Sequence, residues 1–265
     1  NVNLIREIGK LGLGADVVSI GELMMALKAG IKPSKIVFSG VGKTSSEITY
    51  AIDKKILLIN AESKSEITEI EKIAKSKNKT INIGVRLNPN TDAKTLSQIS
   101  TGKKENKFGV TEKMFFEIVK YSKNSKNINL KCLSVHIGSQ ILDHKPYEKM
   151  LRVIDKIIKK SNHNFKFIDL GGGMGISYDN KNKKLNYKKY NIAIKKILKN
   201  HKSKIIFEPG RSIVGNIGTL ISRVIYIKES EKKDFIILDA AMNDLMRPAL
   251  YGASHKTLPV LKKNQ

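Results

Sequence analysis

The sequence has no tryptophan, a single cysteine and only six prolines. A lone Cys132 excludes a disulfide framework and any zinc site built from several cysteines. No apolar run approaches the roughly 18–20 residues that cross a bilayer. The first ten residues, NVNLIREIGK, lack the apolar core and the cleavage site of a signal peptide. These absences predict a cytosolic protein with no membrane partner.

Acidic residues are also scarce, because 24 of them face 49 basic residues and the formal net charge is +25. Only six of the basic residues are arginine, and the lysines are spread along almost every segment. Specific recognition of nucleic acids favours arginine forks and interleaved aromatic rings, whereas aromatic residues make up 6% of this chain. We therefore interpret the charge as mostly a solvated surface that adheres weakly to polyanions, and predict no specific nucleic-acid partner.

Short β-branched runs alternate with amphipathic stretches along most of the chain. Strands are expected at 15–19, 35–40, 56–60, 81–88, 130–138, 165–173 and 204–210, and helices at 1–11, 20–29, 44–53, 64–77, 111–123, 146–161 and 187–200. Ser63 with Glu66 predicts a capping box, Thr111 predicts a second helix start, and Gly30 predicts a helix end. Strand–helix alternation of this length predicts a parallel sheet.

Two architectures compete for this pattern, an open doubly wound sheet and a closed (β/α)8 barrel. Seven strands are expected where a barrel needs eight, and the sequence opens on a helix with no strand before it. We predict an α/β fold with a TIM-type (β/α)8 barrel over residues 1–216 that lacks its first strand. Residues 217–265 contain two strand-like runs with no helix between them, and they predict the start of an antiparallel β domain. On this interpretation the chain is incomplete at both ends.

Polar and glycine-rich residues gather where five of the expected strands end. They are Ser39-Gly40, Arg86 with Asn88, His136 to Gln140, Gly171 to Gly173, and Glu208 to Arg211. In a parallel α/β fold the active site lies at that edge of the sheet. Their convergence therefore predicts one site.

Three of these groups could have either a functional or a purely structural role. Gly171 to Gly173 could cradle a phosphate with backbone N–H groups or could form a tight turn. His136 could stack on a planar cofactor or be a satisfied core residue. Glu208 could face a protonated heterocyclic nitrogen or could form a salt bridge with Arg211 or Arg86.

Two other site classes are not supported by the sequence. Gly40 to Thr44 is similar to the end of a nucleotide-binding P-loop but lacks that motif's first glycine. The five histidines include no pair at metal-binding spacing with a third carboxylate ligand, so no metal is predicted.

Eight motifs together resemble the fold type III pyridoxal-phosphate-dependent decarboxylases. They are GADVVSIGEL (14–23), KIVFSGVGKT (35–44), VRLNPNTDAKT (85–95), ISTGKKENKFG (99–109), VHIGSQI (135–141), LGGGMGISY (170–178), EPGRSIVGN (208–216) and MNDLMRPALYGASH (242–255). The fourth and eighth motifs look like the branch that acts on diaminopimelate rather than the ornithine, arginine or carboxynorspermidine branches or the alanine racemases. The resemblance implies decarboxylation of meso-2,6-diaminopimelate to L-lysine and CO2, with pyridoxal 5'-phosphate as cofactor and a homodimer as the assembly.

The resemblance also implies residue roles. His136 and Glu208 would be catalytic, the first stacked on the cofactor ring and the second paired with the ring nitrogen. The residues implied in cofactor binding are His136, Ser139, Gly171, Gly172, Gly173, Glu208, Pro209, Gly210 and Arg211. Those implied in holding the substrate's carboxylates are Arg211, Arg247 and Tyr251. Arg86 is expected to support Glu208.

Two features of the resembled family have no counterpart in this sequence. The lysine that bonds to the cofactor, in a Tyr-Ala-x-Lys-Ala-Asn segment, would precede Asn1, and a Cys-Glu-Ser-Gly-Asp segment would follow Gln265. We therefore expect the parent protein to be an enzyme and the chain as given to be inactive. Two alternatives stay open, another decarboxylase or racemase of this fold and a non-catalytic barrel that binds the same cofactor.

Overall fold

The structure is a computed structural model that describes residues 1–93, 101–102, 107–178 and 184–260. The motifs predicted at 85–95 and 99–109 lie partly outside these residues.

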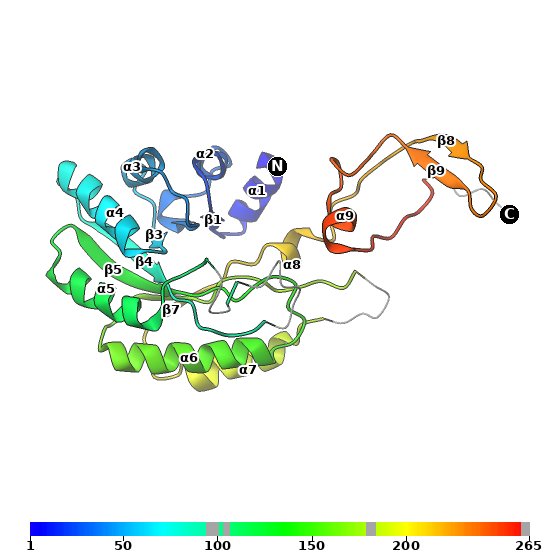
Figure 1. The fold of residues 1–265 in the computed structure, drawn as a ribbon. Coiled ribbons are helices and arrows are strands. Elements are labelled where there is room, and N and C mark those ends of the chain that lie inside the picture. Colours follow the sequence, from blue (N-terminus) through cyan, green and yellow to red (C-terminus); the bar gives the residue numbers. More distant parts are fainter. Residues whose placement is uncertain (94–100, 103–106, 179–183, 261–265) are drawn as a thin grey trace.

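Seven parallel strands form one sheet in which neighbours along the chain are neighbours in space (Figure 1). The strands are β1 (Ala15–Val17), β2 (Ile36–Phe38), β3 (Leu58–Ala61), β4 (Ile81–Arg86), β5 (Ile128–Ser134), β6 (Phe167–Asp169) and β7 (Lys204–Ile206). The helices of this part are α1 (Val2–Lys10), α2 (Ile20–Lys28), α3 (Ser45–Asp53), α4 (Lys64–Ser76), α5 (Glu112–Asn124), α6 (Lys145–Ser161), α7 (Tyr187–Ile197) and the short α8 (Arg211–Val214). A 3-10 turn, η1 (Pro33–Lys35), precedes β2. The predicted strands and helices of the barrel are confirmed.

The strand order decides between the two predicted architectures. It runs from β1 to β7 without reversal, whereas a doubly wound sheet reverses at a switch point. The sheet curls with helices on its outer side (Figure 1), and within the described residues β1 and β7 are each paired on one side only. The fold is therefore an open (β/α) barrel sheet, as predicted.

The core lies between the sheet and its helices, and α6 shows how the sequence builds it. Pro146 stands in the first turn, where its missing N–H costs nothing, and Asn162 ends the helix in the left-handed region at φ 44°. Between them the apolar side chains of α6 recur every three or four residues and are buried against the sheet. Each such burial contributes about 1.5–3 kcal/mol to folding.

The helix start at Ser63 differs from its prediction. Ser63 Oγ accepts a hydrogen bond from the Glu66 N–H at 3.1 Å, as predicted, but the Glu66 carboxylate accepts from the Glu62 N–H instead of closing the box on Ser63. The capping-box prediction is therefore half right. A complete box forms one helix earlier, where Thr44 and Glu47 satisfy each other's backbone N–H groups.

The other two predicted helix boundaries are confirmed. Thr111 Oγ1 accepts from the Met114 N–H at 3.3 Å. Gly30, at φ 91°, follows α2, and the N–H of Ile31 reaches back to the carbonyl of Ala26. That backbone conformation is one that glycine adopts without steric cost.

Beyond the barrel, β8 (Val224–Lys228) and β9 (Phe235–Leu238) form an antiparallel pair, and the short α9 (Arg247–Tyr251) follows. Both strands are exposed along their length and stand away from the barrel sheet (Figure 1). The predicted antiparallel strands are confirmed, while the division into domains at residue 216 stays a prediction. None of the helices in the described ranges has the length and apolar character needed to cross a bilayer.

Candidate active site

Buried polar side chains collect inside the sheet at the edge where the strands end. Asp169, the last residue of β6, is fully buried. It accepts hydrogen bonds from Asn60 Nδ2 and Ser134 Oγ, both at 3.3 Å, and from the Gly171 N–H at 2.9 Å. Burial raises the pKa of Asp169, while these bonds and one from Glu208 oppose the rise. The carboxyl group of Asp169 thus lies where residues from β3, β5, β6 and the segment after β7 meet.

Glu208 is the most perturbed acid of this edge. Burial, followed by the nearby carboxylates of Asp169 and Asp16, raises its pKa well above the usual range, although Arg86 opposes the shift. Its Oε1 atom is shielded from solvent and has no hydrogen-bond partner among the described residues. A carboxyl group in this state is held neutral until a cation lies against it. Glu208 therefore suits a partner that carries a proton on nitrogen.

The salt bridges considered for Glu208 are not found in the described part of the chain. Arg211 donates to the Tyr178 hydroxyl at 2.9 Å, and Arg86 donates from Nη1 to Glu62 Oε1 at 3.1 Å. Arg86 thus acts on Glu208 through its charge and not by contact, which is compatible with the expected supporting role. The positive charge of Arg86 lowers the pKa of Glu208 against the effect of burial.

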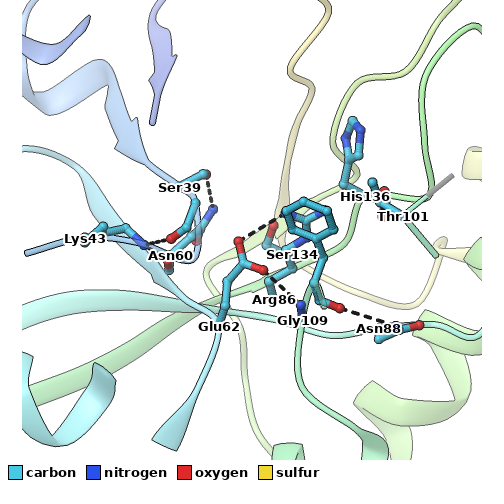
Figure 2. A network of polar contacts seen from close by, with 12 residues as sticks. Ser39, Lys43, Asn60, Glu62, Arg86, Asn88, Thr101, Gly109, Ser134 and His136 are labelled. Atoms are coloured by element: carbon cyan, nitrogen blue, oxygen red, sulfur yellow. Dashed lines mark hydrogen bonds and ion pairs between the residues drawn. The ribbon is translucent and has the colours of Figure 1, made fainter. Parts of the chain in front are cut away.

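Glu62 joins Arg86, at the end of β4, to the backbone of Gly109, a role that the sequence did not indicate. One carboxylate oxygen pairs with Arg86 and the other accepts the Gly109 N–H at 2.9 Å, as Figure 2 shows. The Arg86 guanidinium also lies 4.9 Å from the centre of the Phe108 ring. The Glu62 side chain is nearly inaccessible, at 2% exposure. It follows β3 directly, so the strand-end rule could have included it.

His136 lies just after β5 and is held neutral. Burial and the charge of Arg86 lower its pKa to about 4. Nδ1 accepts a hydrogen bond from the Gly172 N–H at 3.2 Å, which leaves the ring proton on Nε2. The Thr101 hydroxyl donates to the backbone carbonyl of His136 at 3.0 Å (Figure 2). The ring is thus a fixed, uncharged aromatic face at the strand edge.

The three glycines after β6 are needed for close packing of the backbone. A Cβ on Gly171, Gly172 or Gly173 would lie 2.5, 2.0 or 2.1 Å from the nearest carbonyl oxygen, and Gly171 and Gly173 have φ of 64° and 85°. The N–H groups of the first two already bond to Asp169 and His136. The tight-turn interpretation therefore applies to Gly171 and Gly172.

Other backbone amides remain for an anion. In the part of the chain that the structure describes, the N–H groups of Gly173, Gly210 and Arg211 have no assigned acceptor. A Cβ on Gly210 would meet no atom within 4 Å, so packing within the protein does not require glycine there. Ser139 is half-buried directly after Gly138. An anion cradle at these residues is therefore compatible with the structure.

Two of the three residues predicted to bind substrate, Arg211 and Arg247, both contact Tyr178, which was not among the predicted site residues. The Arg211 guanidinium bonds to the Tyr178 hydroxyl, and the Arg247 guanidinium lies 4.3 Å from the Tyr178 ring centre. Tyr251 is exposed at the end of α9, which Arg247 begins. Tyr178 closes the motif LGGGMGISY, and this position was the available signal.

Lys43 is buried and fully engaged. Its ammonium group donates to the carbonyls of Gly40 and Asn60 and to Glu66 Oε1, the last two at 2.7 Å. The side chains of Lys43 and Glu66 are 1% and 9% exposed. The lysine of the P-loop-like segment is therefore structural.

Together, these features fit a planar cofactor with an anionic group and a protonated ring nitrogen. The orphaned oxygen of Glu208 would accept a hydrogen bond from the ring nitrogen, the neutral His136 ring would offer a face, and the backbone N–H groups would donate to the anion.

Comparisons with known proteins give the same picture. Residues 1–215 match the family model described as "Pyridoxal-dependent decarboxylase, pyridoxal binding domain". The chain is 43% identical over 269 residues to diaminopimelate decarboxylase of Aquifex aeolicus, covering 100% of the chain and 64% of that protein. It is 46% identical over 258 residues to the Helicobacter pylori enzyme, covering 96% and 64%. The chain thus spans less than two thirds of the length of these curated relatives.

Solved structures are similar as well. The crystal structure of diaminopimelate decarboxylase from Helicobacter pylori, complexed with L-lysine, superposes with a TM-score of 0.92 at 45% identity, covering 97% of this chain and 66% of that one. Lysine decarboxylase from Selenomonas ruminantium superposes with a TM-score of 0.82 at 21% identity, covering 95% and 64%, which shows a shared fold.

Proposed function

The chain belongs to the pyridoxal-dependent decarboxylase family, and from that membership we propose that the complete protein decarboxylates meso-2,6-diaminopimelate to L-lysine and CO2. The buried, unpartnered Oε1 of Glu208 carries the proposal, because it needs the cation that a pyridoxal ring would supply. The identities of 43% and 46% to diaminopimelate decarboxylases support the choice of substrate.

When bound, pyridoxal phosphate supplies the electron sink for the electron pair that loss of CO2 leaves behind. Glu208, ionised against the ring nitrogen, would keep a proton on that atom. After burial, the nearby carboxyl group of Asp169 is the next cause that raises the pKa of Glu208. Because burial raises the pKa of Glu208 well above its usual range, a cation against the carboxyl group favours its ionised form.

His136 would cover one face of the cofactor ring. Because its pKa is lowered to about 4, the imidazole is neutral at physiological pH and does not compete with the ring nitrogen for Glu208. The hydrogen bond from the Gly172 N–H fixes the ring's rotation and tautomer. This rigid placement means that little side-chain entropy is lost on binding.

The phosphate group would lie among Ser139, Gly173, Gly210 and Arg211. The backbone amides at these positions, where no acceptor is assigned in the described residues, are suitable donors. Pro209 lacks an N–H and would shape the loop without donating.

The substrate's carboxylates would bind to Arg211, Arg247 and Tyr251. Guanidinium groups bind carboxylates with paired hydrogen bonds, and diaminopimelate carries a second amino-acid end that does not react. Arg247 suits that distant end, since it lies beyond the barrel in α9.

The proposal extends to the assembly and to the isolated chain. The complete protein would be a cytosolic homodimer with a barrel over 1–216 and a second domain from 217. Residues 1–265 alone would be inactive, because no lysine stands in the family's sequence context for bonding the cofactor. Lys43, the buried lysine near the site, is already paired with Glu66.

The test is to incubate the complete protein with pyridoxal phosphate and meso-diaminopimelate and to measure L-lysine and CO2. Equal amounts of both products support the proposal, and cofactor binding without product would favour the non-catalytic barrel. The same assay on residues 1–265 alone is expected to give no product, and turnover there would contradict the proposed inactivity.

A further inference from the structure

Tyr178 contacts two arginines that come from different parts of the chain. Its hydroxyl accepts a hydrogen bond from Arg211 Nη1 at 2.9 Å, and the Arg211 guanidinium lies 5.7 Å from its ring centre. The Arg247 guanidinium lies 4.3 Å from the same centre. The separation of the two guanidinium groups therefore cannot exceed the sum of these two distances.

A histidine completes the contact. Arg247 Nη1 donates to His255 Nε2 at 3.1 Å, and the His255 ring stands edge-on to Tyr178 with the ring centres 5.7 Å apart. We call Tyr178, Arg211, Arg247 and His255 the Tyr178 cluster. All four residues are half-buried, although most residues from 240 to 260 are exposed. The cluster is therefore a place where the segment beyond β9 rests on the barrel.

The two arginines are available to bind an anion. Among the described residues neither Arg211 nor Arg247 forms an ion pair with an acidic side chain. Two guanidinium groups at this separation repel each other, and the π-face and hydroxyl of one tyrosine offset that repulsion. A carboxylate bound between or beside them would complete the pairing.

From this geometry we infer that Tyr178 is a positioning residue that orients both arginines toward a substrate with a carboxylate at each end. The inference rests on the proposed function, since that function makes Arg211 and Arg247 substrate-binding. The hydroxyl holds Arg211 through a hydrogen bond, and the ring holds the Arg247 guanidinium over its face through a cation–π contact. Pre-organised guanidinium groups lose less side-chain freedom when the substrate binds, so Tyr178 acts on substrate affinity.

Two variants separate the two contacts. Tyr178→Phe keeps the ring under Arg247 and removes the hydrogen bond to Arg211, whereas Tyr178→Leu removes both. Tyr226→Phe is the matched control, because Tyr226 lies on β8 and is 71% exposed. The complete protein, loaded with pyridoxal phosphate, is assayed for kcat and KM with meso-diaminopimelate. Calorimetry gives the affinities for diaminopimelate and L-lysine, and absorbance gives the affinity for the cofactor.

For Tyr178→Phe we expect KM to rise about tenfold, the loss expected for one hydrogen bond to a charged group. For Tyr178→Leu we expect about 30-fold or more, because the stacking contact is lost as well. In both, kcat should change less than about twofold and cofactor affinity should be unchanged, since a positioning role affects ground-state and transition-state binding alike. Tyr226→Phe should match the wild type.

Unchanged KM and unchanged ligand affinity in Tyr178→Phe would overturn the inference, and so would equal losses of substrate and cofactor affinity. If the wild type turns over diaminopimelate and Tyr178→Phe behaves like it, the inference fails and the proposed function stands. If the wild type binds diaminopimelate without turnover and Tyr178→Phe weakens that binding, the function fails and the inference stands. If the wild type neither binds nor converts it, both fail.

Discussion

The backbone N–H of Gly172 donates to Nδ1 of His136 at 3.2 Å, so the turn after β6 sets the tautomer of the imidazole after β5. The same glycine passes so close to the segment after β7 that a Cβ would lie 2.0 Å from the Glu208 carbonyl oxygen. Gly172 therefore links the two residues proposed to contact the cofactor ring, and it does so through its backbone.

Replacing Gly172 should destabilise the fold strongly, whereas replacing Gly210 in the proposed anion cradle should not. Gly172→Ala places a Cβ against a backbone carbonyl that cannot move freely, and we expect a loss of at least about 3 kcal/mol in the free energy of unfolding.

Gly210→Ala is the matched control, because its Cβ would meet open space. It should unfold within about 0.5 kcal/mol of the wild type but bind pyridoxal phosphate more weakly. Denaturant unfolding and cofactor titration measure the two effects. Wild-type cofactor affinity in Gly210→Ala would remove Gly210 from the phosphate site.

His136 should make the cofactor-free protein sensitive to acid. Its pKa is lowered from 6.5 to about 4, so the unfolded chain takes up a proton that the folded chain refuses. The stabilising contribution is complete above pH 6.5 and is lost as the pH falls toward 4, by at most about 3 kcal/mol. In His136→Asn the urea midpoint should depend less steeply on pH across this window. An unchanged slope would show that the imidazole is not held neutral.

Glu208 should have the opposite effect. Its pKa is raised above the unfolded value of 4.5, so its contribution is complete below that pH and is lost as the pH rises through the folded pKa. In the cofactor-free protein, Glu208→Gln should therefore be more stable at pH 7 by about 1 kcal/mol, with the gain vanishing near pH 4.5.

The same variant should lose activity. Without a carboxylate to hold the ring nitrogen protonated, turnover of the cofactor-loaded protein should fall by about a hundredfold or more. A Glu208→Gln protein that is both less stable at pH 7 and fully active would contradict the role proposed for Glu208.

Glu62 should be a larger contributor to stability than any exposed acid. Glu62→Ala leaves the guanidinium of Arg86, itself 12% exposed, without its partner and frees the Gly109 N–H, so we expect a loss of about 3 kcal/mol. The control is Glu148→Ala, which breaks an exposed ion pair with Arg152 and should cost about 0.3–0.5 kcal/mol. Equal losses in the two variants would show that the Glu62 pair is not a buried one.

The barrel could be predicted because its signals are local. Each strand is a short β-branched run and each helix carries one apolar face, so periodicity alone locates them. Every strand from β1 to β7 overlaps its predicted range, although β3 ends one residue after its range and β5 begins two residues before its range. Gly30 and Thr111 were found for the same reason, since a cap depends on residues within a few positions.

The site was harder to predict where a partner lies far away in the sequence. Glu66 does not complete the capping box at Ser63, because Lys43, 23 residues earlier, and the Glu62 N–H take its oxygens. Arg86 pairs with Glu62 and not with Glu208, and this pairing also joins residues that are distant in the sequence. Tyr178 and Arg247 are separated in the sequence by β8 and β9, so no local sequence pattern indicates that they are in contact.

We propose that the complete protein decarboxylates an amino acid with two carboxylates. The most direct measurement is kcat/KM of the complete, cofactor-loaded protein for meso-diaminopimelate, L-ornithine and L-arginine in one panel. A site in which Arg211 and Arg247 have no acidic partner among the described residues should favour diaminopimelate by about a thousandfold or more, since the competitors lack the second carboxylate. A preference for ornithine or arginine would contradict the account.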